Sequence, residues 1–160
     1  MDFLPDPLHP AVVHFPIALA LVALLLEALA RHPRGRALEP AAVLLVVLSA
    51  VGAIVAVVTG DLAHDEAVVP PAARALIGRH EELGEIAMWA LVVLAVARLV
   101  LARLGRNHGA AAWLYLVLLA AAAGAVGYNG HLGGQAVFRH GVGTDPVQRS
   151  AAPPVMAPAP

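Results

Sequence analysis

Four long apolar stretches constrain the fold of this chain more than any other feature of its sequence. They cover residues 11–30, 41–60, 83–104 and 110–130. A helix needs about 20 mostly apolar residues to cross a hydrocarbon core of roughly 30 Å. In lipid a helix satisfies its backbone hydrogen bonds internally, so each stretch is expected to form a spanning helix. The sequence therefore predicts an all-α integral membrane protein, a four-helix bundle with short loops.

The amino-acid composition narrows the classes of partner and of site. Hydrophobic residues make up 60% of the chain and charged residues 13%, with a mean hydropathy of +0.78, which is typical of a membrane protein. The net charge of −1 argues against a nucleic-acid partner, which requires a basic surface. Cysteine is absent, which excludes disulfides, thiolate metal sites, iron–sulfur clusters and covalently attached c-type haem. The eight histidines remain as the main ligating residues.

The segments around the apolar stretches predict one domain. The four helices are expected within residues 1–143, and the Pro/Ala-rich segment 144–160 has no periodicity and is predicted to be a disordered tail. The first stretch carries His14 and Glu27, and no basic segment precedes it. We therefore interpret it as a spanning helix and not as a cleavable signal.

Several residues predict local features of the helices. Pro16 lies inside the first helix and is expected to bend it, because it removes a backbone hydrogen bond. Arg98 and Arg103 lie near the end of the third stretch, and their long side chains are expected to extend out towards the membrane surface. Small residues recur every fourth position in the second stretch and favour the close approach of another helix: Gly52, Ala56 and Gly60.

The distribution of arginine predicts the orientation of the chain. The first connection holds Arg31, Arg34 and Arg36, and the third holds Arg103 and Arg106. Connections rich in positive charge remain in the cytoplasm. Both termini and the second connection are therefore predicted to lie on the extracytoplasmic side of the membrane.

Most of the histidines are expected at one face of the membrane. With four spans, the termini and the second connection share one side, whichever side that is. Only His32 and His108 fall on the other, basic face. The shared face collects the remaining six, His9, His14, His64, His80, His131 and His140.

Two of these histidines continue stripes of small residues along a helix. His80 precedes Gly84 by four residues, and His131 follows Gly127 and Gly124 on one helical face. A histidine above small residues leaves a flat slot in which a planar ligand could lie. The alternative is ordinary tight packing between helices, including contacts within a homodimer.

The glycine-rich segment 130–141 is interpreted as one wall of the site. Its glycines permit sharp turns, so we expect the chain to fold back over the mouth of the bundle after His131 and to carry His140 with it. The alternative for His140 is an exposed surface residue. For His14, the alternative is a core histidine that donates to a backbone carbonyl.

Haem b is the first of three chemical interpretations of this face. Noncovalent haem requires one or two neutral imidazoles, an apolar slot and cations for the propionates. The predicted axial candidates are His14, His80, His131 and His140, with His9 next. Slot-forming residues would be Gly84, Gly124 and Gly127, and the propionates would meet Arg79 or Arg139.

The second interpretation is a zinc or copper ion, and the third is no cofactor. An ion would be bound by His14, His80, His131, His140 and His64, together with nearby carboxylates. Without a cofactor, the histidines would serve structure, pH sensing or subunit contacts. Catalysis by the chain alone is poorly supported, because no nucleophile motif and no phosphate-binding glycine loop is present.

Two end motifs carry a resemblance to a known family. They are residues 9–16, HPAVVHFP, and residues 130–143, GHLGGQAVFRHGVG. With these motifs the chain resembles, from about Leu8 to Gly143, a bacterial four-helix membrane family catalogued as domain of unknown function 2231. Phe138 stands where the family more usually has tyrosine. The resemblance implies that the shared pattern includes His9, His14, His80, His131 and His140.

The resemblance also favours a redox role, because members of the family occur joined to or encoded beside c-type cytochrome modules. We therefore predict a membrane b-type cytochrome that transfers electrons at the extracytoplasmic face of a bacterial inner membrane. It would be an electron carrier and not an enzyme by itself, with one or two haems. The expected partners are the lipid bilayer and a c-type cytochrome or other redox protein, with a homodimer as a further possibility.

Overall fold

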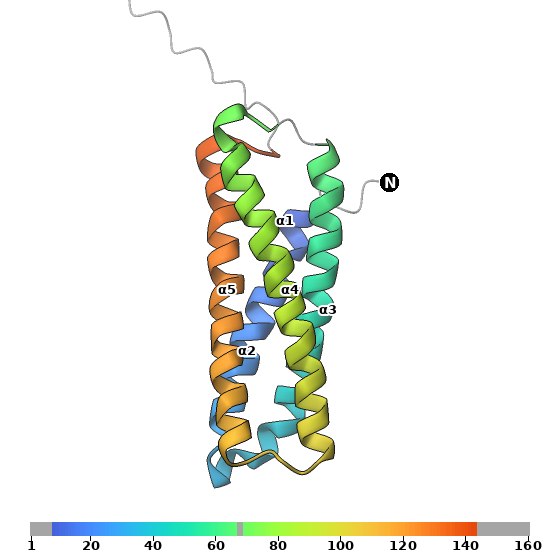
Figure 1. The fold of residues 1–160 in the computed structure, drawn as a ribbon, viewed down its shortest axis with the longest axis vertical. Helices are drawn as coiled ribbons and strands as arrows, with labels where there is room; N and C mark the ends of the chain where they lie inside the picture. The colour runs from blue at the N-terminus through green and yellow to red at the C-terminus, as the bar shows by residue number, and fades with distance from the viewer. Residues whose placement is uncertain (1–7, 67–68, 144–160) are drawn as a thin grey trace, which may run out of the picture.

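The computed structural model describes residues 8–66 and 69–143, so the tail predicted over 144–160 lies outside the described residues. The described part is mostly helical, with no strand, and its four candidate membrane spans form a bundle (Figure 1). The all-α four-helix membrane fold is therefore confirmed. The elements are α1 (His9–Val12), α2 (His14–Ala30), η1 (Pro33–Leu38), α3 (Glu39–Glu66), η2 (Pro71–Ala73), α4 (Arg74–Arg103) and α5 (Ala110–His140).

The two ends of the bundle differ in chemistry. We call the end where α1 and α4 begin and α3 and α5 finish the histidine end. The opposite end, with the connections 31–38 and 104–109, is the arginine end. Three of the spans have 31 to 33 residues, which is roughly 50 Å at about 1.5 Å per residue. That exceeds a hydrocarbon core of roughly 30 Å. The excess lies at the histidine end, where exposed residues change from aliphatic to mostly charged after Val58 and before Ile86.

The first span is broken next to its proline, as predicted. Helix α1 ends at Val12 and α2 begins at His14, a little before Pro16, which has no N–H to donate. Ser49 donates a buried hydrogen bond to the carbonyl oxygen of Pro16 (3.0 Å). A Cβ on Gly52 would lie 3.3 Å from Cδ of Pro16, so the small-residue stripe of α3 lets the first span approach closely.

The four long helices form a ring in which each contacts two neighbours. Helix α2 packs against α3 and α5, and α4 packs against the same two helices (Figure 1). Helices α2 and α4 lie across one diagonal, and α3 and α5 lie across the other. The core between them is built largely of small residues, with Ala20, Ala23, Ala50 and Ala53 buried.

The two halves of the chain share much of their pattern of burial. The hairpin of α1, α2 and α3 corresponds to the hairpin of α4 and α5. Adding 71 to a residue number in α2 gives the corresponding residue in α4; Glu27 and Arg98 are such a pair. Adding 73 to a residue number in α3 gives the corresponding residue in α5, as for Gly60 and Gly133. These offsets superpose buried on buried positions: Pro16/Ala87, Ala20/Leu91, Ala23/Leu94, Glu27/Arg98, Val46/Leu119, Ser49/Ala122, Ala50/Ala123 and Ala53/Val126.

This equivalence describes an internal repeat with an approximate two-fold axis along the bundle. Both hairpins begin and end at the histidine end, as in parallel repeats whose axis follows the membrane normal. Equivalent residues of α2 and α4 therefore face each other across the diagonal. Such a pair can consist of two identical residues or of two residues of opposite charge, and the interactions at the axis differ accordingly.

The predicted helix boundaries at the histidine end were too short. Helix α3 continues through Glu66, α4 begins at Arg74, and α5 continues through His140. The expected fold-back of residues 130–141 is therefore wrong, because this segment is regular helix that ends at Gly141 in the left-handed conformation. Two of its glycines serve close packing: a Cβ on Gly130 would lie 2.9 Å from Cδ1 of Ile17, and one on Gly133 would lie 3.0 Å from Cε1 of His80.

Candidate functional site

A cavity of about 550 Å³ opens inside the bundle at the histidine end. This volume lies within the roughly 300–1,000 Å³ range of small-molecule sites. Four of the six predicted histidines line it, namely His9, His14, His64 and His80. Much of the remaining wall is aliphatic or glycine, including Ile17, Val57, Met88, Val126, Gly60 and Gly133.

His9 is fixed against α3 by a hydrogen bond and by close packing. Its Nδ1–H donates to the carbonyl oxygen of Ala56 (2.8 Å). The ring lies against Gly60, where a Cβ would come within 3.0 Å of Cε1. Donation from Nδ1 leaves the lone pair of the neutral ring on Nε2.

His80 is fixed against α5 in the same manner. Its Nδ1–H donates to the carbonyl oxygen of Asn129 (3.1 Å). The ring lies against Gly133, where a Cβ would come within 3.0 Å of Cε1. In both hairpins, the carbonyl and the glycine are four residues apart on the second helix, so His9 and His80 occupy equivalent half-sites.

The two rings face each other across the bundle axis. Their centroids are 6.2 Å apart and their planes are inclined by 77°. Within the described residues, Nε2 has no hydrogen-bond partner in either ring. The pair therefore presents two oriented imidazoles with free Nε2 lone pairs inside one cavity.

The other two histidines of the cavity lie at its edge. His64 contacts the carboxylate of Glu81 through Nδ1, which joins the end of α3 to the beginning of α4. His14 is exposed and lines the cavity at the start of α2. Asp61 and Glu81 also line the wall, so the edge of the cavity carries negative charge.

His131 and His140 do not line the cavity. His131 is exposed, bonds to Gln135 and stacks on Tyr128, with ring centroids 6.2 Å apart. It is two residues from Asn129, which is roughly 200° around the helix, so it lies on the other side of α5 from His80. His140 is the last residue of α5; Phe138 and Val142 on either side of it line the cavity, but His140 does not.

The predicted slot and propionate partners are only partly at the cavity. Gly84 lines it and faces Asn129, and Gly127 lies at its wall. Gly124 is exposed, with open space where its Cβ would be, so the predicted slot over this residue is not part of the cavity. Arg79 lines a separate surface groove of about 310 Å³, and Arg139 is exposed.

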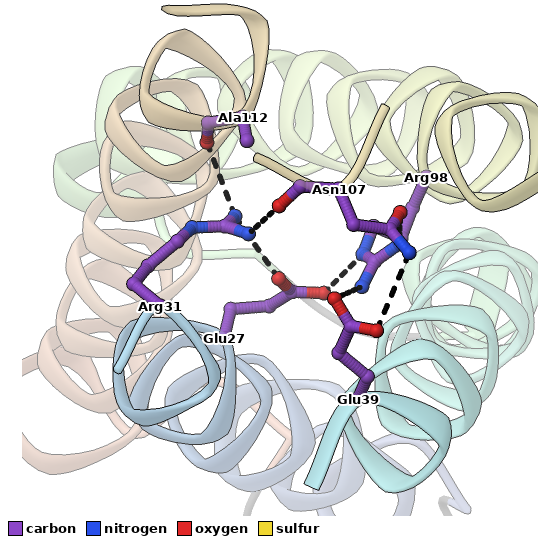
Figure 2. A network of polar contacts seen from close by, with 6 residues as sticks. All are labelled: Glu27, Arg31, Glu39, Arg98, Asn107 and Ala112. Carbon is purple, nitrogen blue, oxygen red and sulfur yellow. Dashed lines mark hydrogen bonds and ion pairs between the residues drawn. The ribbon is translucent and has the colours of Figure 1, made fainter. Parts of the chain in front are cut away.

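The structure also contains a buried ion network at the arginine end that sequence reasoning missed (Figure 2). Glu27 is 0% and Arg98 2% exposed, and the two side chains form an ion pair across the diagonal. The expectation that Arg98 extends to the membrane surface is therefore wrong, because a buried carboxylate of opposite charge faces it. The available signal was one acidic and one basic residue inside two apolar stretches at the same membrane depth.

Further hydrogen bonds extend this network to every long helix (Figure 2). Arg31 donates to Glu27 (3.1 Å), to the carbonyl oxygen of Asn107 (3.0 Å) and to that of Ala112 (3.1 Å). The side chain of Asn107 accepts from Arg98 (3.0 Å) and donates to Glu39 (3.3 Å). Two arginines and two glutamates thus neutralise one another inside the bundle.

No group of three or more His, Asp or Glu side chains close enough to hold a metal ion occurs among residues 8–66 and 69–143. Zinc sites use three or four protein ligands. The predicted zinc or copper set therefore does not come together in the described part of the chain. Two facing imidazoles are the ligand set that the cavity offers.

Comparison with known proteins identifies the family. Searches among curated proteins and among solved structures each gave no match. The family described as "Predicted membrane protein (DUF2231)" matches residues 5–146, which covers both hairpins and the whole cavity. The chain therefore belongs to the DUF2231 family of membrane proteins.

Proposed function

We propose that the protein is a membrane b-type cytochrome that holds haem b between His9 and His80 and transfers electrons. The observation that carries this proposal is the pair of oriented imidazoles with free Nε2 atoms in one largely apolar cavity. The axial pair differs from the sequence-based ranking, in which His14, His131 and His140 stood above His9.

The internal repeat supplies a physical reason for a shared ligand at this position. At the arginine end the equivalent residues have opposite charges, Glu27 and Arg98, and satisfy each other directly. At the histidine end the equivalent residues are identical, and their Nδ1 donors are already used on backbone carbonyls. Two lone pairs cannot satisfy each other, so His9 and His80 are both available to one electron-pair acceptor bound between them.

The number of ligands favours haem over a bare metal ion. The porphyrin supplies four nitrogens to its iron, so one or two imidazoles complete the coordination. With ring centroids 6.2 Å apart in one cavity, His9 and His80 are the residues that would hold the group.

The residues of the chain would orient the ligands and exclude water. The carbonyl oxygens of Ala56 and Asn129 hold the tautomer and the orientation of each ring. Ile17, Val57 and Val126 provide an apolar wall. When bound there, haem supplies a one-electron iron couple. Neither Arg79 nor Arg139 lines the cavity, so propionate binding by these residues has no support from the geometry.

An absorption spectrum tests the proposal directly. The full chain is expressed with sufficient haem, purified in detergent and measured before and after dithionite, with iron and haem quantified on the same sample. We expect a Soret band with reduced α and β bands, lost in His9→Ala and His80→Ala. The matched controls His131→Ala and His140→Ala, outside the cavity, should keep the spectrum. Colourless wild-type protein, or loss of haem only in the two controls, would overturn the assignment.

We further propose that the histidine end faces the extracytoplasmic side of a bacterial inner membrane, where a c-type cytochrome or similar redox protein could exchange electrons. Arginine-rich connections at the opposite end support this orientation. Because the chain has no cysteine, single cysteines at positions 34 and 150 can be labelled without background. An impermeant maleimide added to intact cells should label Ser150→Cys and spare Arg34→Cys. The reverse pattern would refute the orientation.

A further inference from the structure

Buried polar atoms without a hydrogen-bond partner gather at the arginine end of the bundle. Four of the five such side-chain atoms in the described residues belong to the ion network or its immediate surroundings. They are Nε of Arg31, Oε1 of Glu39, Nη2 of Arg98 and the hydroxyl of Tyr115. The fifth, Oδ1 of Asn129, is at the histidine cavity.

Each of the four atoms comes from a different part of the bundle. Arg31 directly follows α2, Glu39 begins α3, Arg98 is on α4, and Tyr115 is on α5. The Nη2 atom of Arg98 and Oε1 of Glu39 are 3.8 Å apart (Figure 2), which is too far for a direct hydrogen bond. Tyr115 is 3% exposed and lies one turn beyond Ala112, whose carbonyl oxygen already accepts from Arg31.

The chemistry of the four atoms selects a small neutral molecule. Two are N–H donors that cannot accept, one is a carboxylate oxygen that can only accept, and the phenol can accept or donate. An anion would be repelled by Glu27 and Glu39, and a cation by Arg31 and Arg98. Water both accepts and donates, so it can satisfy the N–H donors, the carboxylate oxygen and the phenol alike.

We propose that ordered waters bind at these atoms, one of them between Nη2 of Arg98 and Oε1 of Glu39 and another at the hydroxyl of Tyr115. They complete the hydrogen bonding of the ion network at the end opposite the histidine cavity. Buried polar groups without partners are rare in native proteins, and buried waters satisfy those that direct contacts leave. The water site does not depend on a haem at the other end.

Hydroxyl-radical footprinting by X-ray irradiation tests for the water, because radicals form from bound water beside the residues it contacts. The full chain in detergent is irradiated and side-chain oxidation is quantified by mass spectrometry. We expect Tyr115, at 3% exposure, to be oxidised within about tenfold of Tyr128, at 58%. Leu119 is the buried control, one turn further along α5 with 0% exposure. Oxidation of Tyr115 no faster than that of Leu119, each rate being divided by the intrinsic reactivity of its residue type, would overturn the proposal.

An isosteric substitution provides the second measurement. Tyr115→Phe removes the hydroxyl but keeps the ring, so the packing of the core is unchanged. If the hydroxyl holds water, the unfolding equilibrium constant should rise by roughly tenfold. Tyr128→Phe, which is exposed, should leave it unchanged. An unchanged or more stable Tyr115→Phe protein would show that the hydroxyl is buried without a partner, and would refute the water site.

Discussion

Substitution of Gly133 by alanine should disturb the packing of His80 without lowering the stability of α5. Gly133 lies inside α5, and a Cβ there would be 3.0 Å from Cε1 of the His80 ring. Nonbonded carbon atoms are at their energy minimum about 3.5–4.0 Å apart, so the ring must move by roughly 0.5 Å. The hydrogen bond from His80 to the carbonyl oxygen of Asn129, now 3.1 Å, would then pass the usual limit of about 3.2 Å.

The two effects of this substitution have opposite signs. Alanine in the interior of a helix is about 0.8–1.0 kcal/mol more favourable than glycine, so the ligand-free protein should not lose stability. Loss of the hydrogen bond that orients a ligating histidine lowers affinity by roughly 10–100-fold. Gly133→Ala should therefore bind haem more weakly while its helix becomes more stable. A general folding defect cannot produce this combination.

The control is Gly124→Ala, on the same helix, where the new Cβ would meet no atom within 4 Å. It should gain the same helix stability and keep full affinity. Haemin is titrated into each ligand-free protein in detergent, and thermal unfolding is followed by circular dichroism. The reasoning is refuted if Gly133→Ala binds haemin within about twofold of wild type, or if Gly124→Ala loses affinity to the same extent.

Three further predictions concern the bundle itself. Glu27→Gln leaves two buried arginines without their carboxylate and should destabilise the protein by about 3–5 kcal/mol in reversible denaturation. The double variant Glu27→Leu/Arg98→Leu should recover part of that loss. A change under about 1 kcal/mol in Glu27→Gln would contradict the role of the network. Ser49→Ala removes the hydrogen bond to Pro16 and should cost about 1 kcal/mol in the same assay, and no change would show that the bond contributes nothing. A circular permutant that begins at residue 69 and joins residue 143 to residue 8 through a flexible linker should insert into the membrane and keep the spectrum of the natural chain. The reason is that both hairpins begin and end on the same side of the membrane. Failure to insert would argue against equivalent hairpins.

The sequence alone determined the class of fold and the grouping of the histidines. The thickness of the hydrocarbon core sets the length of a spanning helix, so four apolar stretches were sufficient to predict four spans. Connectivity then placed six histidines at one end, because an even number of spans returns the chain to its starting side. Pro16 and the Gly52–Gly60 stripe also gave correct local predictions, since a missing N–H and a missing side chain act locally.

Tertiary structure decided which of these histidines share a cavity. Rotation of α5 turns His131 away from His80, and hydropathy does not report the rotation of a helix whose faces are all apolar. Gly130 and Gly133 remained helical because close packing on Ile17 and His80 compensates for their low helix propensity. The pairing of Glu27 with Arg98 depends on two helices that meet across a diagonal, 71 residues apart in the chain. The repeat that unites both ends is visible only in the pattern of burial, because the two hairpins share positions in space and few residue identities.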